Sequence, residues 1–244
     1  MATREGNNRE QEFIDAALEL FYQKGIEETT VNNIIDKVGL TKGAFYHYFD
    51  SKESIYKAAS KYYVDKKVEV VKGITKEQNI DAIEKLNRIN SEIVNIKLNN
   101  ADFRWKIYKV ISSNKNIKID KLIKEQFLIE AKPYYTNIIL QGIQEGTINT
   151  RFPEETAEFL IHLNNLINKM ITDSIFGDET LLESMEVIIK KMADPQNQLI
   201  IMRKLEFYED TLVRILGTKE GDIDFAEFII NKLRELYGNY EGGE

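Results

Sequence analysis

The sequence contains no cysteine, which excludes disulfides, thiolate metal sites and cysteine nucleophiles. Its only histidines are His47 and His162, so a histidine-rich metal site is excluded as well. No apolar run approaches the roughly 20 residues of a membrane helix, and the polar N-terminus lacks the apolar core of a secretory signal. We therefore expect a cytoplasmic protein with no metal and no resident cofactor.

Proline is also scarce, because only three prolines occur in 244 residues, and this leaves room for long helices. The chain is 43% hydrophobic and 30% charged, a composition typical of folded and not of disordered proteins. Its 33 basic and 40 acidic residues give a net charge of −7, which argues against a protein that coats nucleic acid or anionic lipid.

Apolar residues recur at helical spacing along almost the whole chain, and no hairpin signature occurs. The first helix carries the stripe over 13–21 and ends at Gly25. The second carries the stripe over 31–38, is capped by Thr30 and ends at Gly39. We therefore predict an all-α fold that begins with short, compact helices.

Further helices follow towards the C-terminus. A third begins at Thr41, and Asp50 with Glu53 resembles the capping box of a long fourth helix over about 52–72, which Gly73 would end. Pro133 predicts a kink or break, and Pro153 suits the first turn of a helix. The later helices are expected over about 76–98, around 103–108, and over 119–145, 154–173, 178–193, 196–216 and 222–237, the last ended by Gly238.

The segment from Thr30 to Phe49 has the layout of a helix-turn-helix, whose second helix lies in the major groove of DNA. Gly39 permits the turn, and Leu40 and Phe45 would pin the second helix against the first. Between Asp36 and Asp50 the chain carries only basic or neutral side chains, with Lys37, Lys42 and His47 as the titratable nitrogen bases. This element is locally positive, although residues 1–60 have seven basic and ten acidic side chains. Because a basic face is usual for DNA-binding modules, we expect modest affinity for one module and binding by two.

The run from Ala16 to Tyr56 resembles the DNA-binding region of the tetracycline-repressor (TetR) family. The match covers about a sixth of the chain, and it departs from the family pattern at Ile35, where a small residue is common, and at Tyr48, where His or Arg is frequent. Its matching features are Phe21, Gly25, Thr30, Gly39, Thr41, Gly43, the Tyr46–Phe49 block and Ser51-Lys52-Glu53.

The resemblance implies a three-helix DNA-binding domain over 1–54, joined through the long fourth helix to a helical ligand-binding and dimerisation domain over 55–244. It implies a base-edge or phosphate contact for Lys42, and contacts with base edges or thymine methyls for Gly43 and Ala44. It implies phosphate contacts for Thr30, Thr41, Tyr46, His47 and Lys52. Without the resemblance, Tyr46 would be interpreted as core, His47 as a surface histidine and Lys52 as a solvated cap.

A homodimer is implied through the helices over 154–173 and 196–216. The second of these has a broad apolar face, which we interpret as dimer contact, with ordinary intramolecular core as the alternative. That face consists of Leu199, Met202, Leu205, Leu212, Ile215 and Leu216.

An effector pocket is expected among the aromatic-rich middle helices, where apolar walls would carry a few polar anchors. An aromatic cluster is more often core than pocket, and a lone histidine such as His162 on an apolar face is more often a hydrogen-bonded core residue than a ligand contact. The candidate ligand-binding residues are Arg104, Trp105, Tyr108, Phe127, Tyr134, His162 and Asn165.

These features predict a homodimeric repressor that a small, largely apolar ligand releases from a pseudo-palindromic DNA operator. An α-helical protein-interaction adaptor and a ligand-independent regulator or activator remain as alternatives. An enzyme is not expected, because no nucleophile elbow, phosphate-binding glycine loop, HExxH motif or paired carboxylate motif stands out.

Overall fold

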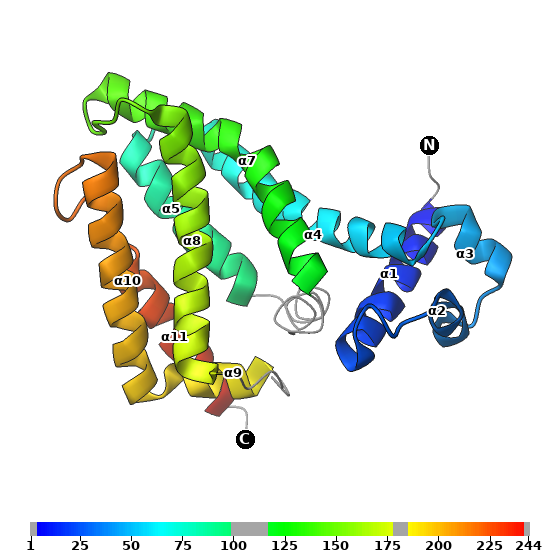
Figure 1. The fold of residues 1–244 in the computed structure, drawn as a ribbon. Helices are drawn as coiled ribbons and strands as arrows, with labels where there is room; N and C mark the ends of the chain where they lie inside the picture. Colours follow the sequence, from blue (N-terminus) through cyan, green and yellow to red (C-terminus); the bar gives the residue numbers. More distant parts are fainter. Residues whose placement is uncertain (1–3, 99–116, 178–184, 242–244) are drawn as a thin grey trace. The chain divides into compact units, whose positions relative to one another are not determined.

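The computed structural model describes residues 4–98, 117–177 and 185–241, and every regular element in these ranges is an α-helix (Figure 1). This confirms the predicted fold class. The helices are α1 Arg4–Lys24, α2 Val31–Val38, α3 Lys42–Tyr48, α4 Lys52–Thr75, α5 Ala82–Leu98, α7 Ile117–Glu145, α8 Pro153–Phe176, α9 Met185–Ala193, α10 Pro195–Leu216 and α11 Ala226–Glu241.

The described chain divides into two compact units. The first contains residues 4–66 and 117–126, and the second contains residues 67–98, 127–177 and 185–241. Residues of both units therefore occur in α4 and in α7. The predicted boundary after residue 54 falls near the start of α4, within the first unit.

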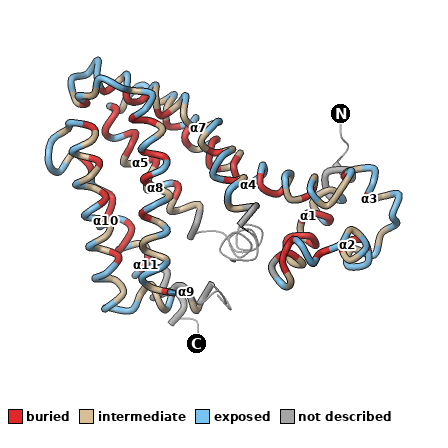
Figure 2. The backbone as a smooth tube through the Cα atoms, in the orientation of Figure 1, coloured by how far each residue is buried: buried red, intermediate tan, exposed pale blue. Residues whose placement is uncertain are grey.

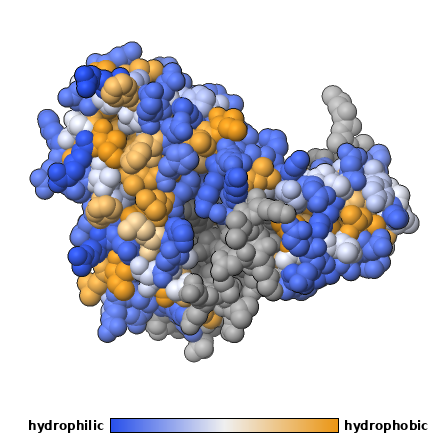
Figure 3. Space-filling model, in the orientation of Figure 1, coloured by the Kyte–Doolittle hydropathy of each residue, from blue (hydrophilic) through white to orange (hydrophobic). Residues whose placement is uncertain are grey.

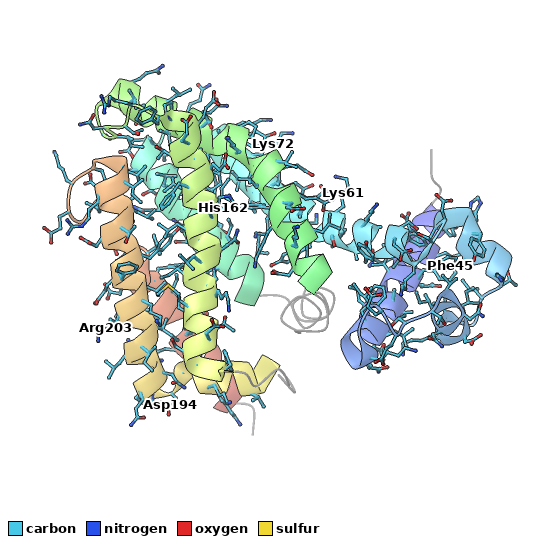
Figure 4. The ribbon with its side chains drawn as sticks, in the orientation of Figure 1. Phe45, Lys61, Lys72, His162, Asp194 and Arg203 are labelled. Atoms are coloured by element: carbon cyan, nitrogen blue, oxygen red, sulfur yellow. The ribbon has the colours of Figure 1, made fainter. Side chains whose placement is uncertain are left out.

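Phenylalanine rings form the centre of the first unit, in which α1 packs against α2 and α2 against α3. Phe45 of α3 (Figure 4) meets Phe13 of α1 edge to face at 5.5 Å, and Phe49 lies 6.3 Å from Phe13. Phe21 of α1 and Ile34 of α2 are fully buried. These contacts hold α3 on the unit by its buried side and leave its other side exposed.

The start and end signals of the first helices behave as predicted. Gly25 and Gly39 end α1 and α2 with φ of +87° and +74°, values that favour glycine. Thr30 caps α2, and its hydroxyl accepts the backbone N–H of Asn33. Pro153 occupies the first turn of α8, also as predicted.

Several predicted boundaries are wrong, because the signals involved cost little in a packed helix. The capping box before α4 is formed by Ser51 and Ser54 and not by Asp50 with Glu53. Each serine hydroxyl accepts the backbone N–H of the other serine.

Gly73 lies inside α4, where glycine costs only about 1 kcal/mol relative to alanine. Pro133 lies inside α7, as in the predicted helix over 119–145, and of the predicted kink or break the break does not occur. Pro133 is exposed, so water can bond the carbonyl that proline leaves unpaired. Gly238 also lies inside a helix, α11. The helix expected around 103–108 lies outside the described residues.

The second unit is a bundle in which α8 packs along α10, and α11 packs against α9, α10 and α5. Figure 2 shows that buried residues line the inward sides of these helices. At one end of the bundle Gly142 of α7 lies so close to Ile148 that an added Cβ would come within 2.5 Å of that side chain. None of the described helices is long and apolar enough to span a membrane.

Candidate functional site

The starts of α2 and α3 carry two threonines that cap their helices. The Thr30 hydroxyl accepts the Asn33 N–H at 3.2 Å, and the Asn33 side chain accepts the Thr30 N–H at 3.0 Å. The Thr41 hydroxyl accepts the Ala44 N–H at 3.2 Å. Both threonines are exposed, and each hydroxyl still has its own proton to donate. A phosphate at either helix start would therefore find a hydroxyl donor at the positive end of a helix dipole.

The outward side of α3 is small and basic at its start and aromatic further on. Lys42, Gly43 and His47 are exposed, and Ala44 is half-buried. Tyr46 is 48% exposed and packs edge to face on Phe45 at 5.2 Å, so its ring is held while its hydroxyl is available. The interpretation of Tyr46 as core does not fit this exposure.

Gly43 is not required by packing within the protein. A Cβ added there would meet only the Thr41 hydroxyl oxygen, at 3.9 Å, which is ordinary van der Waals contact. Close approach of a partner to the backbone remains as a physical reason for the missing side chain. This position therefore fits the base-edge role that the sequence predicts for it.

The lysines near α3 have different surroundings. Lys37 pairs with Glu19 at 2.8 Å, so its charge is partly neutralised. The Lys42 ammonium lies 6.0 Å from the centre of the Tyr46 ring and is exposed at the start of α3. Lys42 is thus the cation that this helix offers to a partner.

Lys52 has a structural role that sequence reasoning missed. Its ammonium donates to the carbonyl of Ile26 at 2.6 Å and to that of Glu27 at 3.3 Å. It thereby ties the start of α4 to the loop between α1 and α2. The predicted phosphate contact stays a prediction, and an ammonium with three protons could still make one.

In the second unit, α8 and α10 share an exposed apolar face (Figure 3). Leu166 of α8 is 53% exposed and Phe207 of α10 is 55% exposed, and the exposed Phe159 and Leu199 lie two helical turns from them. The face predicted from sequence is different: Leu205, Leu212 and Leu216 are buried core, Met202 and Ile215 are half-buried, and only Leu199 is exposed.

The predicted ligand-binding residues that the structure describes differ in their surroundings. Phe127 is buried, with the Lys67 ammonium 4.1 Å from its ring centre, and Tyr134 and Asn165 are half-buried. His162 has a 59% exposed side chain on the face with Phe159 and Leu166, so the alternative of a core histidine is wrong. Arg104, Trp105 and Tyr108 lie outside the described residues.

A polar cluster instead lies inside the second unit. The Asn164 amide of α8 donates to Asn90 of α5 and to the Tyr208 hydroxyl of α10, both at 3.3 Å. Asn168, one turn along α8, donates to the backbone and side-chain oxygens of Asn164 at 2.6 and 3.0 Å. Sequence reasoning missed this cluster, although Asn164 and Asn168 do interrupt the apolar pattern of the helix over 154–173.

Tyr208 makes the stability of this bundle sensitive to alkaline pH. Burial raises the pKa of Tyr208 to about 12, against a small lowering by the Asn164 hydrogen bond, and burial also raises the pKa of Tyr135. A phenol with a raised pKa stabilises the fold below its unfolded value near 10, and this stabilisation is lost as pH rises towards 12.

We expect the free energy of unfolding to fall between pH 10 and pH 12, with Tyr208 accounting for up to about 3 kcal/mol of the loss. Urea unfolding followed by circular dichroism at several pH values checks this. Tyr208→Phe should show a shallower fall than wild type, while Tyr134→Phe should follow wild type. Parallel curves for Tyr208→Phe and wild type would contradict the expectation.

The first unit is all-α and presents the short helix α3 after the turn at Gly39, with capped helix starts and an exposed lysine. This arrangement is typical of a helix-turn-helix DNA-binding protein. Comparison with known families agrees. Residues 13–59 match the family of bacterial regulatory proteins, tetR family, and residues 103–177 match the tetracyclin repressor-like C-terminal domain. Together the two matches span half of the chain. The protein therefore belongs to the TetR family of transcriptional regulators.

Curated relatives are regulators as well. The chain is 26% identical to the uncharacterized HTH-type transcriptional regulator YerO of Bacillus subtilis (strain 168) over 77% of its own length and 64% of that protein. It is 27% identical to IcaR, the biofilm operon icaADBC negative transcriptional regulator of Staphylococcus aureus (strain Newman), over 58% of its length and 84% of IcaR. The chain thus spans slightly less than two thirds of YerO.

A solved structure is similar to this protein in fold over most of the chain. The SmeT–triclosan complex superposes with a TM-score of 0.61 at 15% identity, over 89% of this chain and 95% of SmeT. At this identity the likeness establishes a shared fold alone.

Proposed function

We propose that this protein is a homodimeric repressor that binds a pseudo-palindromic operator and leaves it when a small, largely apolar molecule binds. The observation that carries the proposal is the outward side of α3, where Lys42 and the Tyr46 hydroxyl are exposed beside the Thr41 cap. The proposed role is regulatory and not catalytic, and we propose the cytoplasm as its location. Residues 1–54 would act as the DNA-binding domain and 55–244 as the effector and dimerisation domain.

The proposed DNA contacts follow from the two capped helix starts. Thr30 and Thr41 would donate their hydroxyl protons to phosphates, and Lys42, Gly43 and Ala44 would meet base edges as α3 enters the major groove. Further phosphate contacts would come from Tyr46, His47 and Lys52. One such module reads few bases, and therefore two are needed for specific binding.

A second copy of the chain is the proposed partner of the α8–α10 face. Exposed phenylalanines and leucines on two neighbouring antiparallel helices suit the four-helix contact of a two-fold dimer. Such a dimer would present two α3 helices to successive major grooves about 34–36 Å apart.

Release by a small molecule is proposed from relatives and from the chain's own connectivity. SmeT was solved with triclosan bound, and IcaR is named a negative regulator. In this protein α4 is a single helix that begins at the DNA-binding helices and continues into residues of the second unit. A ligand that favours a different position of α4 would shift the population away from the DNA-binding state.

Selection from a pool of random duplexes at two salt concentrations tests the proposal. We expect the full chain to enrich a pseudo-palindromic site and to lose affinity steeply at the higher salt concentration. A single, non-symmetric half-site would refute the homodimer. No enrichment, with or without added metabolites, would instead favour a protein-interaction adaptor.

A further inference from the structure

A cavity of about 30 Å³ lies in the second unit among α5, α8, α10 and α11. Its polar lining is the cluster of Asn90, Asn164, Asn168 and Tyr208, and the rest of its wall is aliphatic or phenylalanine. The volume is about that of one water molecule in the liquid. None of the described residues predicted to bind the ligand lines it.

The described residues that line this cavity carry no charge. Among them asparagine and tyrosine supply the polar groups, and none is a lysine, arginine, histidine, aspartate or glutamate. An ionic group placed there would lose its hydration without gaining a counter-ion, which is strongly unfavourable. The cavity therefore favours a neutral occupant.

The hydrogen bonds of the lining side chains indicate which polar group that occupant should carry. The Asn164 amide donates to the Asn90 side-chain oxygen and to the Tyr208 hydroxyl oxygen. Among the residues that the structure describes, neither the Asn90 amide group nor the Tyr208 hydroxyl proton has an acceptor within hydrogen-bond distance. Tyr208 is only 3% exposed, so bulk water does not satisfy its donor. The buried Tyr208 hydroxyl of α10 thus lacks an acceptor at this cavity, and the half-buried Asn90 amide of α5 is a second donor beside it.

We propose that this cavity is the effector site and that it takes a neutral, largely apolar molecule with one hydrogen-bond-accepting oxygen, such as a ketone or an ester. The oxygen accepts from Asn90 and Tyr208, and the apolar remainder lies against the aliphatic wall. The effector role rests on the proposed repressor function, whereas the binding site does not. Small-molecule sites usually measure about 300–1,000 Å³, so binding must enlarge the cavity.

Three probes with one ring and different charge test the site on the full chain: cyclohexanone, cyclohexanecarboxylate and cyclohexylamine. The readout is the NMR signals of the side-chain amides of Asn90, Asn164 and Asn168, assigned by their loss in single Asn→Ala variants. We expect cyclohexanone to shift these signals in a saturable manner at millimolar concentration. The anionic and cationic probes should leave them in place.

Matched variants then test the donors. Tyr208→Phe keeps the ring and removes the hydroxyl, and it should weaken cyclohexanone binding about three- to tenfold. Tyr62→Phe removes the hydroxyl of an exposed tyrosine of α4 that does not line the cavity, and it should bind like wild type. If Tyr208→Phe does not fold, Asn90→Leu provides the same comparison by removing the other donor.

Several results would overturn the proposal. These are no saturable shift at the asparagine amides, equal shifts from the charged probes, undiminished binding by Tyr208→Phe and Asn90→Leu, or an ordered water as the only occupant. Operator binding is measured separately, without probe. Failure to bind any duplex would refute the repressor function but not the site, while cyclohexanone binding without any change in operator affinity would refute the effector role.

Discussion

Lys42→Ala should weaken binding to the selected operator roughly 100-fold, because a dimer loses two cationic contacts of about tenfold each. Lys42 lies exposed at the start of α3, and its ammonium is 6.0 Å from the centre of the Tyr46 ring. If it contacts phosphates, the slope of log affinity against log salt should become shallower by about two units per dimer. Titration of labelled operator at several salt concentrations measures both quantities.

The matched control is Lys72→Ala, which removes the same charge from an exposed position in the last turn of α4 (Figure 4). It should leave operator affinity within about twofold of wild type, since long-range charge effects are screened beyond roughly 10 Å at 0.1 M salt. Equal loss in both variants would mean that net charge, and not the α3 surface, governs binding. An unchanged salt slope in Lys42→Ala would contradict the phosphate contact.

Substitutions of Tyr46 test the same α3 surface in a second way. Its ring packs on Phe45, so Tyr46→Phe keeps this contact and removes only the hydroxyl. A loss of affinity in Tyr46→Phe would thus report the hydroxyl, whereas a loss confined to Tyr46→Ala would report packing of α3. The comparison separates the DNA role predicted for Tyr46 from the packing of its ring on Phe45.

The features that the sequence predicts well are those determined within one helical turn. The Thr30 cap, the Gly39 turn and the start of α8 at Pro153 each depend on neighbouring residues. The Gly73 prediction fails because a local penalty of about 1 kcal/mol does not end a helix that packing supports elsewhere, and for the same reason Pro133 does not break α7.

The contacts that the sequence does not reveal join distant residues. Lys52 bonds a carbonyl 26 residues earlier, and Asn164 bonds partners 74 and 44 residues away. An amphipathic pattern shows that a helix face is buried but not what covers it. This explains why Leu205 and Leu212, predicted at a dimer contact, are core, while Phe207 between them in sequence is exposed.

The residues for a test of the dimer are therefore chosen by the exposure of their side chains and not by the helical periodicity of the sequence. Phe207→Glu should raise the dimer dissociation constant at least about 100-fold, because each copy would place an unpaired carboxylate in an apolar contact. Analytical ultracentrifugation over a range of protein concentrations measures this constant. Because Phe207 is 55% exposed in the single chain, the substitution should leave the fold and its circular dichroism unchanged.

Phe228→Glu is the matched control, since Phe228 is an exposed phenylalanine on α11, outside the α8–α10 face. It should remain dimeric and bind operator like wild type. Phe207→Glu, as a monomer, should lose the cooperative binding of a full palindrome while its α3 surface is intact, so binding to an isolated half-site should persist at the affinity of one module. A dimeric Phe207→Glu that binds the full operator normally would show that another surface holds the two copies together.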